Sequence, residues 1–118
     1  LICEDDLGQQ AKIIAHLESM FGGQGEVAVN CVGGAIQGLA IILNSPIDLI
    51  ILDHDMPDGN GLVLLLEMKK RNIEVPIITF SGIPLNNQAL MFYGASYEFL
   101  KDDVIAGQAD DIIRKILG

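Results

Sequence analysis

Asp53 lies at the end of a short apolar segment, where a carboxylate can take part in chemistry. The segment, residues 49–52, consists only of Leu and Ile, and the following turn at 54–61 contains Pro and Gly. This pattern predicts a strand buried on both faces of a parallel sheet. Ligands bind at the carboxyl ends of such strands, and a carboxylate there is costly without a cation or a chemical task. Taken alone, Asp53 is equally consistent with a structural residue whose side chain caps the loop by hydrogen bonding to its backbone.

Other apolar segments end in groups that complement Asp53. They are two acids, a hydroxyl and an ammonium: Glu4, Asp5, Ser81 and Lys101. These are the groups needed to accept a phosphoryl group on an aspartate. The aspartate is the nucleophile, and a metal, a hydroxyl and an ammonium stabilise charge on the transferring oxygens.

Alternating strand and helix patterns must position these groups. Short apolar runs predict five strands, at residues 1–3, 27–31, 48–53, 75–80 and 97–100. Helical spacing predicts five helices, at residues 9–21, 35–43, 61–70, 84–93 and 106–117, the first ended by Gly22-Gly23. This alternation predicts an α/β fold with a flavodoxin-like, doubly wound parallel sheet in the order 2-1-3-4-5.

In that order the first and third strands are neighbours, so Glu4 and Asp5 lie beside Asp53. Three carboxylates in one small cleft repel one another. A hard divalent cation relieves this repulsion, and Mg²⁺ suits oxygen ligands and retained water. The sequence therefore predicts Mg²⁺ as the cofactor.

Composition limits the domain count and the partners. The chain has 118 residues, which fit one domain, and we expect residues 1–118 to be part of a longer chain. Its formal charge is -9, which disfavours direct binding to nucleic acid or to an anionic membrane. No apolar stretch has the length of a membrane span.

The order and spacing of these residues resemble the receiver domain of the two-component response regulator family. Five landmarks carry the resemblance over essentially the whole chain: residues 2–6, 48–53, Met56-Pro57 with Gly61, 76–82, and 94–96 leading to Lys101. The resemblance implies a single receiver domain that catalyses only its own phosphorylation and dephosphorylation. It has no independent substrate.

The resemblance also implies a role for each site residue. Asp53 is the phosphoacceptor and a metal ligand, Ser81 moves toward the phosphoryl group, and Lys101 pairs with it. Asp5 ligates Mg²⁺ directly, and Glu4 acts mostly through water. Asp55 contributes its main-chain carbonyl.

The implied partner is a histidine kinase or a histidine phosphotransfer protein in the bacterial cytoplasm. It donates the phosphoryl group from a phosphohistidine. Phosphorylation then changes the face made by the fourth helix, fifth strand and fifth helix, through which an effector domain or a second copy can bind.

Three residues depart from the family pattern: Asp102, Glu98 and Asp55, which is an extra acid at the mouth of the site. Asp102 follows Lys101 where Pro is common, and Glu98 stands where an aromatic residue is usual on the fifth strand. Tyr97 and Phe99 can replace that aromatic residue only if the strand register slips by one. The usual aromatic switch is therefore in question.

Two alternatives remain open. One is a degenerate receiver that acts as a phosphorylation-independent binding module. The other is a haloacid-dehalogenase-like phosphatase, because Asp53-His54-Asp55, Ser81 and Lys101 occur in that order. The phosphatase family expects this acidic motif after the first strand, whereas here it follows the third.

Overall fold

One parallel sheet forms the centre of the molecule. The computed structural model describes residues 1–21, 28–58 and 61–117. Within these ranges, five parallel strands pair in the order β2-β1-β3-β4-β5, which confirms the predicted order. The strands are β1 (Ile2–Cys3), β2 (Cys31–Val32), β3 (Ile50–Leu52), β4 (Ile77–Thr79) and β5 (Tyr97–Glu98).

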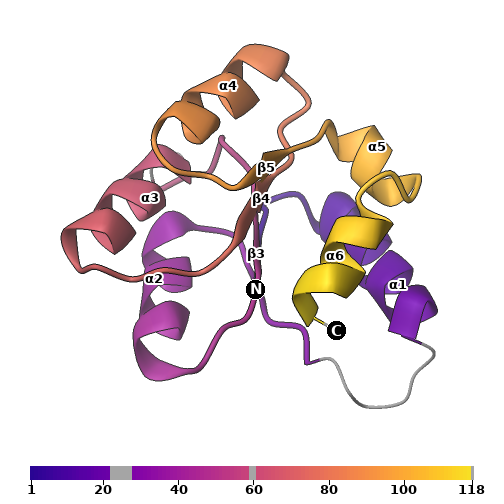
Figure 1. Cartoon of the computed structure of the whole chain (residues 1–118), viewed down its shortest axis with the longest axis horizontal. Coiled ribbons are helices and arrows are strands. Elements are labelled where there is room, and N and C mark those ends of the chain that lie inside the picture. Colours follow the sequence, from indigo (N-terminus) through magenta and orange to yellow (C-terminus); the bar gives the residue numbers. More distant parts are fainter. Residues whose placement is uncertain (22–27, 59–60, 118) are drawn as a thin grey trace.

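The helices cover both faces of this sheet (Figure 1). One face carries α1 (Leu7–Phe21), α5 (Lys101–Ile105) and α6 (Asp110–Leu117). The other carries α2 (Ala35–Asn44), α3 (Gly61–Lys70) and α4 (Pro84–Phe92). In the described residues, no helix combines the length and apolar character needed to cross a membrane.

The apolar residues of β3 explain why the sheet is buried on both sides. Side chains alternate between the faces of a strand. Ile50 and Leu52 accordingly join the core beneath α2, α3 and α4, whereas Ile51 joins the core beneath α1 and α6. All three are buried, as expected for a central strand of a doubly wound sheet.

The carboxyl-terminal region differs from the prediction of one helix at 106–117, so the described residues contain six helices rather than five. Helix α5 begins already at Lys101 and ends before Gly107, which has φ of +93°. The Gly107 N–H donates to the Val104 carbonyl, and the Gln108 N–H donates to the Asp103 carbonyl. This pair of bonds with a left-handed glycine is a Schellman motif, which ends α5 before α6 begins.

The second strand is also shorter than predicted. Only Cys31 and Val32 pair with β1. The predicted strand residue Val27 and the predicted helix stop Gly22-Gly23 lie outside the described residues. The other predicted strands and helices are present with their bounds shifted by a few residues.

Candidate functional site

The sheet topology brings the predicted site residues to one cleft. Strand pairing aligns Cys3 with Leu52, Leu52 with Thr79, and Thr79 with Glu98. The residues that follow these positions therefore share one edge of the sheet. The cleft there is lined by all the candidates: Glu4, Asp5, Asp53, Asp55, Ser81 and Lys101.

Asp53 is central in this cleft and is only 3% exposed. Its Oδ1 accepts a hydrogen bond of 2.8 Å from the His54 backbone N–H. Its Oδ2 lies 3.2 Å from the Lys101 Nζ. Burial raises the pKa of Asp53, while the nearby Lys101 charge opposes the increase. The carboxylate is therefore held by a backbone donor and a cation but is poorly solvated.

Lys101 joins Asp53 to Glu4. Its Nζ lies 2.7 Å from the Glu4 Oε2, and the ammonium also lies 5.6 Å from the centre of the Phe80 ring. Burial lowers the pKa of Lys101, but the hydrogen bond to Glu4 and the charge of Asp53 outweigh it, so the pKa is raised. Burial raises the pKa of Glu4, again against the effect of Lys101. One ammonium thus compensates two buried carboxylates.

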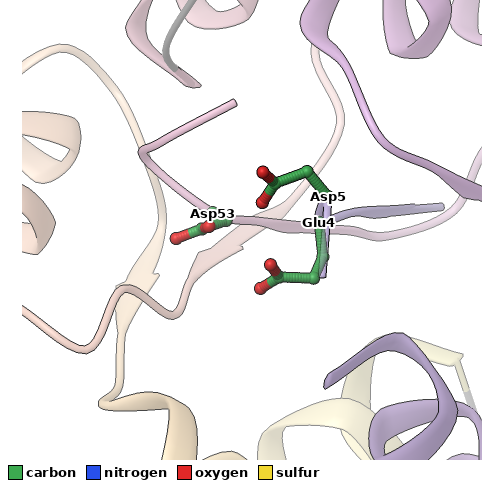
Figure 2. A group of neighbouring side chains, drawn as sticks. All are labelled: Glu4, Asp5 and Asp53. Atoms are coloured by element: carbon green, nitrogen blue, oxygen red, sulfur yellow. The ribbon is translucent and has the colours of Figure 1, made fainter. Parts of the chain in front are cut away.

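Three acids are close enough to share a cation. Oxygen atoms of Glu4, Asp5 and Asp53 lie within 4.8 Å of one another, and Figure 2 shows these side chains at the tips of β1 and β3. Both Glu4 oxygens already have partners: the Asp6 N–H at 3.1 Å and Lys101. Asp5 is exposed. The donor set therefore fits a divalent cation, and Asp5 is the most accessible of the three acids.

Ser81 is buried at the end of β4 and faces the same cleft. Its Oγ accepts a hydrogen bond of 3.1 Å from the Ile83 N–H. The hydroxyl proton remains available as a donor. A Cβ added at the following Gly82 would meet no atom within 4 Å, so the backbone beside the hydroxyl borders open space.

The loop after β3 holds Asp55 at the mouth of the cleft. The Asp55 carboxylate is 69% exposed and lies 2.9 Å from the Nδ1 of His54. The Gly61 N–H closes the described part of the loop by donating to the His54 carbonyl at 2.6 Å. Glycine is required at 61 because an added Cβ would collide with the Asp53 carbonyl oxygen. The close packing of Gly61 against the Asp53 backbone therefore constrains the conformation of the loop next to Asp53.

The departures from the family pattern at Glu98 and Asp102 have clear positions. Tyr97 and Phe99 pack against the core beneath α1 and α6, whereas Glu98 is exposed on the α4 side. The register of β5 therefore does not slip, and neither Tyr97 nor Phe99 takes the position of Glu98. Asp102 is exposed in the first turn of α5, and Lys101 still reaches the cleft.

Sequence reasoning missed Asn87, a buried polar residue of α4. Its side chain bonds Ser81 and Thr79 on one side and Phe99 on the other. The available signal was spacing, because Asn87 precedes the buried Leu90 by three residues and so lies on the same helix face. An amide on the buried face of a helix needs hydrogen-bond partners.

Comparison with known proteins places this geometry in a family. The family described as Response regulator receiver domain matches residues 1–115. The transcriptional regulatory protein TorR of Escherichia coli O157:H7 is 37% identical over 83 residues, which are 70% of this chain and 33% of that protein. The transcriptional regulatory protein PmrA of Pectobacterium parmentieri is 34% identical over 83 residues, 70% of this chain and 35% of that protein. The chain thus spans about a third of the length of these two relatives.

Solved structures share the fold at lower identity. The receiver domain of a sensor histidine kinase of Pseudomonas aeruginosa PAO1 has a TM-score of 0.82 and 22% identity, with 99% of this chain and 94% of that chain covered. A CheY-like receiver domain protein of Methanospirillum hungatei has a TM-score of 0.74 and 24% identity, with 98% and 90% covered. With the strand order, the acid-lined cleft and the match over residues 1–115, the chain belongs to the response regulator receiver domain family.

Proposed function

We propose that this receiver domain accepts a phosphoryl group on Asp53 from a phosphohistidine of a histidine kinase or phosphotransfer protein. The observation that carries the proposal is the contact of one ammonium, Lys101, with the buried Asp53 inside an acid-lined cleft. A buried carboxylate with its cation and a free hydroxyl nearby has the parts that phosphoryl transfer requires.

Transfer follows from the groups that surround Asp53. A carboxylate oxygen attacks phosphorus, the N–P bond of the donor breaks, and the imidazole leaves with the bonding electron pair and takes up a proton. Lys101 exchanges its contact with Asp53 for one with a phosphoryl oxygen. The Ser81 hydroxyl donates to another. Lys101 and Ser81 both stabilise the negative charge that develops on the phosphoryl oxygens during transfer.

The acids of the cleft would hold Mg²⁺. Asp5 and Asp53 would supply carboxylate oxygens, Asp55 its main-chain carbonyl, and Glu4 would act through water. When bound, Mg²⁺ neutralises charge on the phosphoryl oxygens. The related Pseudomonas aeruginosa domain has a magnesium ion coordinated in its active site cleft, which supports this proposal.

The surface around α4 supports a role in partner binding. Ile83, Leu85 and Phe92 are large apolar side chains that are exposed on or next to this helix, and Leu100 is exposed after β5. We propose that an effector domain or a second copy of the chain binds this face in the bacterial cytoplasm. The formal charge of -9 disfavours direct binding to nucleic acid or to an anionic membrane.

A small N–P donor tests the proposed transfer without a cognate kinase. Incubation with phosphoramidate and Mg²⁺ should give an acyl phosphate signal in ³¹P NMR. Asp55→Asn keeps its main-chain carbonyl and should retain the signal, whereas Asp53→Asn should lose it. No signal in the parent chain would support the degenerate receiver instead. Multiple turnover of an added phosphate monoester would support the phosphatase.

A further inference from the structure

Asn87 is buried beneath the strand tips of the site, although it belongs to α4 and is only 3% exposed. Its Oδ1 accepts hydrogen bonds from the Thr79 hydroxyl at 2.7 Å and from the Ser81 N–H at 2.8 Å. Its Nδ2 donates to the Ser81 carbonyl at 3.1 Å and to the Phe99 carbonyl at 2.9 Å. A carboxamide has two acceptor sites and two donors, so the side chain is fully satisfied.

These partners fix the orientation of the amide and require its chemistry. The Ser81 and Phe99 carbonyls can only accept hydrogen bonds, so they must face the NH₂ group. A carboxylate of the same shape would place an oxygen against both carbonyls. A leucine would leave the buried Ser81 N–H and two carbonyls without these partners, which is unfavourable in a buried position.

The Asn87 side-chain amide replaces a direct backbone hydrogen bond between the ends of β4 and β5. The Phe99 N–H donates directly to the Thr79 carbonyl at 2.9 Å. In a regular parallel ladder, the next bond would run from the Ser81 N–H to the Phe99 carbonyl. Both of those groups bind the Asn87 side chain instead. The inserted amide therefore joins the ends of two strands and one helix.

This insertion connects two groups of the site to α4. Ser81 carries the hydroxyl that faces the cleft, and Phe99 precedes Lys101 by two residues. Asn87 holds both segments, so it sets the spacing between the hydroxyl and the ammonium. If Ser81 moves toward Asp53, the two Asn87 bonds to Ser81 must either break or draw α4 with them.

We propose that Asn87 is a positioning residue that holds Ser81 and transmits a displacement of Ser81 to α4. The inference rests on the proposed function, because occupation of the Asp53 site is the event that moves Ser81. In this proposal, the buried Asn87 amide connects the site to the surface of α4. The exposed Glu98 makes no comparable bond to Ser81 among the described residues.

Amide NMR spectra of the ¹⁵N-labelled chain test this connection. Beryllofluoride with Mg²⁺ serves as the phosphoryl analogue, and the variants are Asn87→Leu and, as a matched control on the same helix, Asn86→Leu. The His54 N–H reports occupation of the site, because it bonds Asp53 directly. The Leu90 and Phe92 amides report the position of α4.

The expected result separates site occupation from its transmission. In the parent chain and in Asn86→Leu, the analogue should shift the His54 amide and the α4 amides. In Asn87→Leu, the His54 shift should remain and the α4 shifts should be lost. Equal α4 shifts in Asn87→Leu and in the parent chain overturn the inference alone. An unresponsive His54 amide in the parent chain overturns the proposed function, and the inference with it.

The parent chain also provides a test that needs no folded variant. The side-chain NH₂ signals of Asn87 should move when the analogue binds, because both of their acceptors lie in segments of the site. If these signals stay fixed while the His54 amide shifts, Asn87 does not transmit the change.

Discussion

Removal of the Lys101 ammonium should destabilise the fold in a pH-dependent manner. Lys101→Met keeps much of the apolar length but leaves Glu4 and Asp53 without the cation that lies 2.7 and 3.2 Å from them. Loss of one partner from a wholly buried ion pair typically costs about 3–5 kcal/mol. The Lys101 side chain is 22% exposed, so water can screen part of the charge and we expect a loss of about 2 kcal/mol at neutral pH.

The pH dependence follows from the direction of the carboxyl pKa shifts. Burial raises the pKa of Glu4 and of Asp53, so the folded state binds these protons more tightly than the unfolded state. The contribution of these two groups to the stability of the parent chain should therefore fall as the pH rises from the ordinary carboxyl range toward neutrality. Without Lys101, both pKa values should rise further. The loss of stability of Lys101→Met relative to the parent chain should then be small in acid and largest at neutral pH.

Urea denaturation in the presence of a chelator measures this deficit. The chain contains no Trp, so far-UV circular dichroism is a suitable signal. With a denaturant slope of about 2 kcal/mol/M, the midpoint should fall by about 1 M at neutral pH. Lys115→Met, at an exposed position of α6, is the matched control and should change little. A deficit that is equal in acid and at neutral pH, or no larger than that of the control, would refute the reasoning.

The β3–α3 loop and the acid cluster give two further predictions. Gly61→Ala should destabilise the fold by about 1–3 kcal/mol, because its Cβ meets the Asp53 carbonyl oxygen, whereas the Cβ of Gly82→Ala enters open space and should cost less. Urea midpoints compare the stabilities of the two variants, and equal losses would contradict the steric argument. Asp5→Asn should weaken Mg²⁺ binding about tenfold or more in calorimetric titrations. Asp55→Asn should change the Mg²⁺ affinity less, because the Asp55 carboxylate points to His54. The opposite ranking would contradict the proposed ligand set.

The strand order and the grouping of Glu4, Asp53 and Lys101 in one cleft were predictable because they depend on a strong local signal. Asp53 follows a buried strand, and the alternation of strands and helices predicts which strand tips are neighbours. The same reasoning placed Glu4 and Lys101 in one cleft with Asp53, as observed. It did not predict that Lys101 bonds Glu4, because that contact depends on side-chain positions between strands distant in sequence.

Other features required local geometry that apolar spacing does not show. The final helix was predicted at 106–117, but Gly107 adopts a left-handed conformation, so α6 begins only at Asp110 and a separate helix, α5, occupies residues 101–105. A glycine shortly after Lys101–Ile105 was a usable stop signal. Asn87 was missed because its role depends on the gap between two strand ends, which only the assembled sheet defines.

The central claim is that Asp53 accepts a phosphoryl group, and intact-mass spectrometry tests it most directly. The parent chain and Asp53→Ala are incubated with acetyl phosphate and Mg²⁺. The account predicts one phosphoryl adduct on the parent chain, which is absent from Asp53→Ala and is lost when the metal is chelated beforehand. An adduct of equal yield on both proteins, or none on the parent chain, would contradict it.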